Sequence, residues 1–157
     1  MKILPTLEGG LRIDIEEPGD WRLLQGITHD AVSCTESLAQ RLGNLITDED
    51  VAPDWQEYIV PDLDEAFHAD LSHVAASIAA AHVDCGGGAG PLWIIPDEAC
   101  QWYGALNQAR LALEEIHHFG PTETIDPARL SPAVRSAFLR SQFYCAIQSL
   151  LLEHVMK

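Results

Sequence analysis

Apolar residues recur at steps of three and four along four long segments of this 157-residue chain. That spacing is typical of one face of an α-helix, because 3.6 residues make one turn. A proline stands at or beside the start of each segment, where its missing amide hydrogen leaves no helical hydrogen bond unmade. The sequence therefore predicts main helices over residues 18–43, 62–83, 96–118 and 132–156.

The first sixteen residues show a different period. "KILPTL" and "LRIDIE" flank a glycine turn, and Leu11, Ile13 and Ile15 alternate with polar residues as in a half-buried strand. Two strands alone are marginal in water, so we expect the apolar face of this 1–16 hairpin to lie on helices. The stretch "PLWIIP" predicts a short extended piece that adds to the hairpin edge. The expected fold is mainly α (α+β): a single domain, residues 1–157, that is four-helix bundle-like with an N-terminal β-hairpin.

Three consecutive glycines in "HVDCGGGAG" allow three interpretations. A phosphate-binding loop would need Lys and Ser or Thr after the glycines and a helix start, whereas Pro91-Leu92-Trp93 follow. A metal site would need two more ligands beside His82 and Cys85, at a suitable spacing. We therefore expect the glycines to end the preceding helix.

The net charge of −15 is unevenly spread. No lysine or arginine occurs between Arg41 and Arg110, whereas twelve acidic residues do, eight of them within residues 48–65. A surface of this kind repels phosphate groups, so we expect no nucleic-acid binding and no binding to a membrane surface. The acidic region 48–65 serves either solubility or a basic partner or cation.

The cysteines and the N-terminal residues bear on the compartment. No pattern in "MKILPTLEGGLRIDIE" is typical of an export signal, and the four cysteines are widely spaced without a CxxC motif. Reduced thiols and a cytoplasmic location are therefore expected. The longest apolar run, "VAASIAAAHV", is too short to span a bilayer.

The segment "WYGALNQARLAL" resembles the W-x-x-x-LN-x-x-RLAL helix of an uncharacterised domain-of-unknown-function family. That family is common in actinobacteria and is typically encoded beside the Clp protease adaptor. "GGLRIDIEEPGDWRLL" and "QSLL" also match its pattern, while the glycine loop and His117-His118 depart from it. The resemblance implies a mainly helical domain with an N-terminal hairpin and an accessory role in proteolysis or regulation. It transfers no catalytic residue.

The polar residues inside this motif are the candidate binding residues: Asn107 and Arg110, with Trp102 beside them. Arg110 shares a helix face with Leu106 and Leu113, so its guanidinium is expected to be partly buried. It is then either paired with a carboxylate in a structural tie or available to hold an anion or a peptide carboxylate.

A helical metalloenzyme is the alternative hypothesis. Helix bundles that bind two irons use Glu-x-x-His from two helices and lone glutamates from two others. This sequence offers Asp70-x-x-His73 and Glu114-x-x-His117. Of these two histidines, only His117 faces the apolar stripe of its helix, so Glu114 and His117 are the candidate ligands. No GxSxG elbow is present, the catalytic residues are unknown, and no cofactor is expected. The leading hypothesis is a non-catalytic cytoplasmic interaction or accessory protein.

The last predicted helix carries two apolar stripes on opposite sides. One contains Val134, Phe138, Cys145, Leu152 and Val155, and the other contains Leu139, Phe143, Ile147 and Leu150. One stripe is enough to dock a surface helix on its own domain. Either the hairpin covers the second stripe, or it mediates self-association in a two-fold homodimer.

Overall fold

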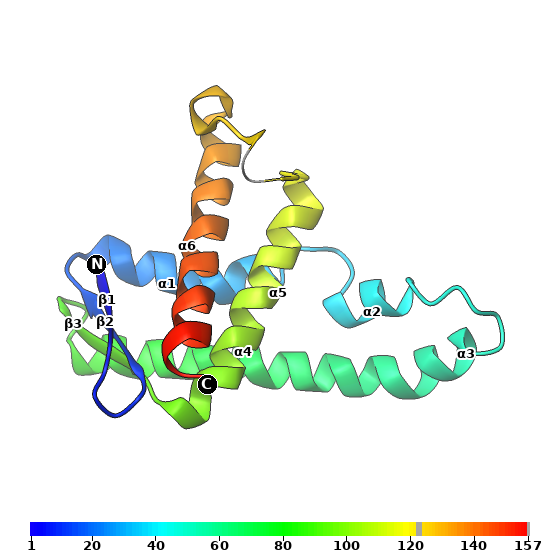
Figure 1. Ribbon diagram of the computed structural model, residues 1–157, viewed down its shortest axis with the longest axis horizontal. Helices are drawn as coiled ribbons and strands as arrows, with labels where there is room; N and C mark the ends of the chain where they lie inside the picture. The colour runs from blue at the N-terminus through cyan, green and yellow to red at the C-terminus, as the bar shows by residue number, and fades with distance from the viewer. Residues whose placement is uncertain (122–123, 157) are drawn as a thin grey trace.

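The computed structural model describes residues 1–121 and 124–156, and it confirms a mainly α fold with a small antiparallel sheet (Figure 1). The strands are β1 (Lys2–Pro5), β2 (Leu11–Ile15) and β3 (Gly90–Ile94). The α-helices are α1 (Pro18–Ala31), α2 (Leu38–Gly43), α3 (Ala52–Asp54), α4 (Val60–Asp84), α5 (Ala99–His117) and α6 (Pro132–His154). The described residues also form short helical segments: the π-helical η1 (Trp55–Ile59) and the 3₁₀-helical η2 (Pro96–Glu98) and η4 (Pro127–Arg129).

Helix α5 lies at the centre of the domain and packs against α1, α4 and α6. Alanines at 105, 109 and 112 are fully buried, and small side chains at such positions let neighbouring helices approach closely. Trp102 and Leu106 complete the buried face, both with no exposed surface. The predicted "RLAL" helix is therefore the element around which the core forms.

The three strands form one sheet in the order β1-β2-β3, and both pairings are antiparallel. Leu11 pairs with Ile94 and Ile13 with Leu92, so the buried side chains of two strands share the face that packs on the helices. The predicted hairpin and its extension by "PLWI" are both confirmed. Gly10 is required here, because a Cβ atom would lie 2.4 Å from the Ile94 carbonyl oxygen.

The predicted single helix over residues 18–43 is wrong, because the chain leaves the helical path between α1 and α2. Ser37 caps α2: its hydroxyl accepts from the Gln40 amide, and the Gln40 side chain accepts from the Ser37 amide. This capping box competes with continuation of α1. The spacing of apolar residues continues across the break, so the break could not be recognised from that spacing.

The glycine loop ends α4, as predicted. Gly86 and Gly87 have φ angles of +59° and +75°, and the Gly87 amide donates to the His82 carbonyl at 2.9 Å. The loop is also attached to α1, since the indole N–H of Trp21 donates to the Gly88 carbonyl at 2.9 Å. That contact joins residues 67 positions apart, and no local pattern predicts it.

Helix α6 buries parts of both predicted stripes. Ile147, from the second stripe, has no exposed surface, whereas Leu152, from the first, is 51% exposed. The reason is that α6 packs on α5 and also contacts β1 and β2, as in the alternative where the hairpin covers the second stripe. Phe143 and Leu150 pack partly on the core, and Leu139 remains 54% exposed. Ile147 is therefore not part of any free surface.

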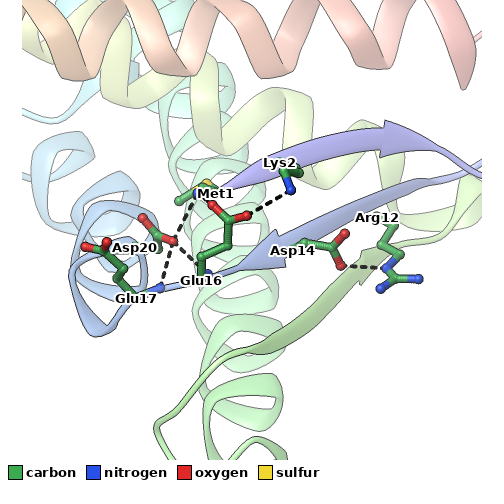
Figure 2. A network of polar contacts seen from close by, with 7 residues as sticks. All are labelled: Met1, Lys2, Arg12, Asp14, Glu16, Glu17 and Asp20. Carbon is green, nitrogen blue, oxygen red and sulfur yellow. Dashed lines mark hydrogen bonds and ion pairs between the residues drawn. The ribbon is translucent and has the colours of Figure 1, made fainter.

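A polar network ties β1 to the start of α1 (Figure 2). The Met1 amine donates to Glu16 Oε2 at 2.6 Å and lies 3.4 Å from Asp20 Oδ2. Asp20 in turn accepts from the backbone amides of Glu16 and Glu17, which caps the helix. The hydrogen bond from the amine holds the pKa of the Glu16 carboxyl below its ordinary value. The network therefore has a structural role: it holds the N-terminus against the start of α1.

Across residues 1–121 and 124–156, none of the helices combines the length and the apolar character needed to cross a membrane.

Candidate functional site

Two of the three residues predicted for binding line one cavity. Asn107 and Arg110 from α5 lie in a cavity of about 190 Å³, together with Glu114, the first of the two candidate metal ligands. Leu111 of α5 also lines it, and its remaining walls come from the segment after α5 and from α6: Phe119, Gly120, Phe138, Ser141 and Gln142. The spacing of three and four residues along α5 places the polar side chains on the same side. Trp102 is fully buried and lies outside the cavity lining.

Arg110 has no carboxylate partner among the described residues, so the expected structural tie is wrong. Its Nη1 donates to Gln148 Oε1 at 2.6 Å, and Gln148 Nε2 donates to the Tyr103 carbonyl at 3.2 Å. The Arg110 Nε atom is buried without a hydrogen-bond partner. A helical face can be read from the sequence, but Gln148 comes from α6, so its contact with Arg110 depends on how the two helices pack.

Glu114 and His117 make other contacts and belong to no group of metal ligands among the described residues. The Glu114 carboxylate accepts from the Gly120 amide at 3.1 Å, and the His117 ring stacks on Phe119 with 5.4 Å between ring centroids. Phe119 packs in turn on Phe138. Within residues 1–121 and 124–156, no three His, Cys, Asp or Glu side chains come together in a group that could hold a metal ion.

A second carboxylate-x-x-His pair, Asp70 and His73, lies on α4. His73 Nε2 is 3.6 Å from Glu98 Oε1. The Asp70 carboxylate lies against Gly104, where a Cβ atom would approach Asp70 Oδ2 to 2.2 Å. Burial raises the pKa of the Asp70 carboxyl above its ordinary value. Ionised Asp70 therefore opposes folding.

The variant Asp70→Asn is expected to raise the melting temperature by a few degrees at neutral pH and by less in acid. The raised pKa means that Asp70 favours the folded state while it is protonated. That contribution is lost as pH rises from the ordinary value of 3.8 through the folded-state pKa. Asparagine stays neutral throughout. Thermal unfolding at about pH 3 and about pH 7 checks this. The exposed Asp64→Asn on the same helix is the control, and an equal effect of Asp70→Asn at both pH values would contradict the prediction.

The buried arginine–carboxylate pair of this protein is Asp30–Arg140. Asp30 is 3% exposed and accepts from Arg140 Nε at 2.7 Å and Arg140 Nη2 at 3.0 Å. The Tyr144 hydroxyl donates to Asp30 Oδ2 at 2.8 Å. The hydrogen bond to Asp30 raises the pKa of Arg140, and burial raises the pKa of Tyr144. The sequence signal for this cluster is the position of Asp30, which follows the buried Leu24 and Ile27 at the same step of three residues along α1.

Beside this pair, α1 and α6 share an apolar hollow of about 390 Å³. We call this surface the α1/α6 face; its lining residues are Leu23, Pro132, Arg135, Ser136, Leu139, Arg140 and Phe143. The exposed Arg22 lines the adjoining depression with His29. Arg135 donates to the carbonyls of three residues in the preceding segment, Pro127, Ala128 and Leu130. Neither Arg22 nor Arg135 forms an ion pair with a described carboxylate, so this surface of a strongly acidic protein carries two arginines without an acidic partner among the described residues.

A family model described as "Domain of unknown function (DUF2017)" matches residues 35–155. The match begins in the break between α1 and α2 and includes the Arg110 cavity. It confirms the predicted resemblance to a family of unknown function. No curated protein and no solved structure matches the chain significantly.

Proposed function

The chain belongs to the DUF2017 family of unknown function, and we propose from its structure that it is a non-catalytic interaction protein that binds a second copy of itself. The observation that carries this proposal is the α1/α6 face. Leu139 in its lining is 54% exposed, and Arg22 and Arg135 lie at the same surface without carboxylate partners among the described residues. An exposed apolar patch with uncompensated charges at its edge is typical of a contact surface.

A complementary surface lies elsewhere on the same chain. We call residues 45–59, which include α3 and η1, the acidic arm. Its exposed apolar side chains are Leu45, Val51, Tyr58 and Ile59, and its exposed carboxylates are Asp48, Glu49, Asp50, Asp54 and Glu57. The arm therefore offers apolar groups that can pack in the apolar hollow of the α1/α6 face and negative charge that can pair with its arginines.

The position of the arm favours contact between copies rather than within one. Figure 1 shows α3 at the far end of α4, at the opposite end of the molecule from the start of α1. When two copies exchange arms, each arm covers the α1/α6 face of the other copy. Two identical contacts of this kind form a closed two-fold dimer. This arrangement retains Leu139 and Phe143 from the predicted self-association surface and does not use the buried Ile147.

Sedimentation tests the proposal. The wild-type protein is expected to be a dimer in the high micromolar range, and Leu139→Glu is expected to weaken dimerisation at least about tenfold by placing a carboxylate in the apolar hollow. The matched control is Leu7→Glu in the β1–β2 turn, because Leu7 is fully exposed. A wild-type monomer under these conditions would overturn the proposal.

Mixing two variants tests the exchanged arrangement. Leu139→Glu disrupts binding by the α1/α6 face, and the double substitution Glu57→Lys and Tyr58→Ser disrupts binding by the acidic arm. Each variant alone should be monomeric, while an equimolar mixture should form a dimer that keeps one intact arm-on-face contact. If the arm variant dimerises as well as the wild-type protein, the arm is not the partner surface.

A further inference from the structure

Two opposite charges line the Arg110 cavity without contacting each other. Arg110 and Glu114 are four residues apart on α5, a spacing at which oppositely charged side chains commonly pair. Arg110 instead donates to Gln148, and Glu114 instead accepts from the Gly120 amide. The cavity therefore presents a cationic group and an anionic group separately, both on its wall.

The guanidinium of Arg110 is held in position by a neutral partner. Gln148 is 3% exposed, and its own amide donates to the Tyr103 carbonyl, so its oxygen is fixed toward Arg110. A neutral amide orients the guanidinium, and no carboxylate within residues 1–121 and 124–156 pairs with it. A partly buried cation without an anion is unfavourable, and a carboxylate ligand would relieve this.

The rest of the lining combines polar and apolar groups. Asn107 and the nearly buried Ser141 lie near the charged groups, and the rings of Phe119 and Phe138 supply an apolar wall. The volume of about 190 Å³ is smaller than the roughly 300 Å³ at which pockets for drug-sized ligands begin. We therefore expect a ligand that is small and partly apolar and that carries one negative and one positive group.

We propose that this cavity binds a free α-amino acid with an apolar side chain. Its carboxylate contacts Arg110, its ammonium group contacts Glu114, and its side chain packs on Phe119 and Phe138. The zwitterion satisfies both charges at once, which neither a simple anion nor a simple amine does. This site is on a different face from the surface used for self-association, so it does not depend on the proposed function.

Calorimetric titration of the full chain tests the proposal with L-leucine, L-valine and L-methionine as probes. Binding of at least one is expected. For that amino acid, the amide, which lacks the carboxylate, and the N-acetyl derivative, which lacks the ammonium group, should each bind at least about tenfold more weakly. No heat from any of the three amino acids at millimolar concentration overturns the proposal. Equal binding of the N-acetyl derivative also overturns it, because Glu114 would then have no role.

Variants separate the two charges. Arg110→Gln should weaken binding of the amino acid at least about tenfold, and Glu114→Gln should remove the preference over the N-acetyl derivative. The control is Glu115→Gln, next to Glu114 but outside the cavity lining. Glu114 is exposed, so its variant should fold, and circular dichroism checks the fold of each protein. Unchanged selectivity in Glu114→Gln would overturn the assignment. Sedimentation of the same samples reports on self-association independently.

Discussion

Replacing Asp30 with alanine is expected to lower the free energy of unfolding by about 3 kcal/mol. The Asp30 side chain is 5% exposed and that of Arg140 is 29% exposed, so the variant leaves a largely buried guanidinium without its bidentate partner. The Tyr144 hydroxyl, which is also buried, loses its acceptor. We place the effect at the lower end of the range for broken buried pairs because water still reaches part of Arg140.

Chemical denaturation with urea measures this effect. The control is Asp14→Ala, which removes the 2.6 Å pair with Arg12 on the sheet surface, where exposed pairs contribute at most about 1 kcal/mol. Asp30→Asn should fall between the two, because its amide oxygen can still accept one hydrogen bond. Equal urea midpoints for Asp30→Ala and Asp14→Ala would show that the Asp30–Arg140 pair does not stabilise the fold.

Replacing Trp102 with alanine is expected to destabilise the protein by about 3–5 kcal/mol. Trp102 has no exposed surface and lies on α5, the helix on which α1, α4 and α6 converge. Truncation leaves a large cavity that the surrounding helices can close only in part. Trp102→Phe should cost much less, since the indole N–H is buried without a hydrogen-bond partner and its removal relieves a desolvated donor.

Trp93 provides the control for Trp102. It is 50% exposed on β3, and its ring lies under the Arg12 guanidinium, with 5.3 Å between the guanidinium carbon and the ring centroid. Trp93→Ala should therefore cost about 1 kcal/mol or less. Because Trp102 lies outside the cavity, Trp102→Phe should leave amino-acid binding unchanged. A loss of stability below about 1 kcal/mol for Trp102→Ala would refute its role in the core.

Local patterns predicted the elements of the fold well. The alternation of Leu11, Ile13 and Ile15 predicted β2, and the proline at position 132 predicted the start of α6, where the hydroxyl of the preceding Ser131 accepts from the Val134 amide. These signals are local in sequence, because strand alternation and helix capping involve residues within a few positions of one another. The break between α1 and α2 was missed because apolar spacing continued through it.

The candidate site was predicted in part. Asn107, Arg110 and Glu114 were identified from one helix, since their spacing alone places them on one side. The sequence did not show that Trp102 belongs to the core. A tryptophan on an apolar helix face has the same sequence pattern whether it lines a pocket or is covered by another helix. The hydrogen-bond partner of Arg110 could not be predicted either, because Gln148 contacts it only when α6 packs on α5.

By itself, the sequence determined which segments are helices and strands, where most of them begin and end, and where the negative charge lies, because period, capping and charge are properties of neighbouring residues. Only the tertiary structure decided that Arg140 and not Arg110 holds the buried carboxylate, and that α6 buries Ile147 and exposes Leu139. Both depend on contacts between residues far apart in the chain: Asp30 and Arg140 are 110 positions apart. Such contacts follow from the rotation of each helix about its axis against its neighbours, and many rotations satisfy the same apolar period.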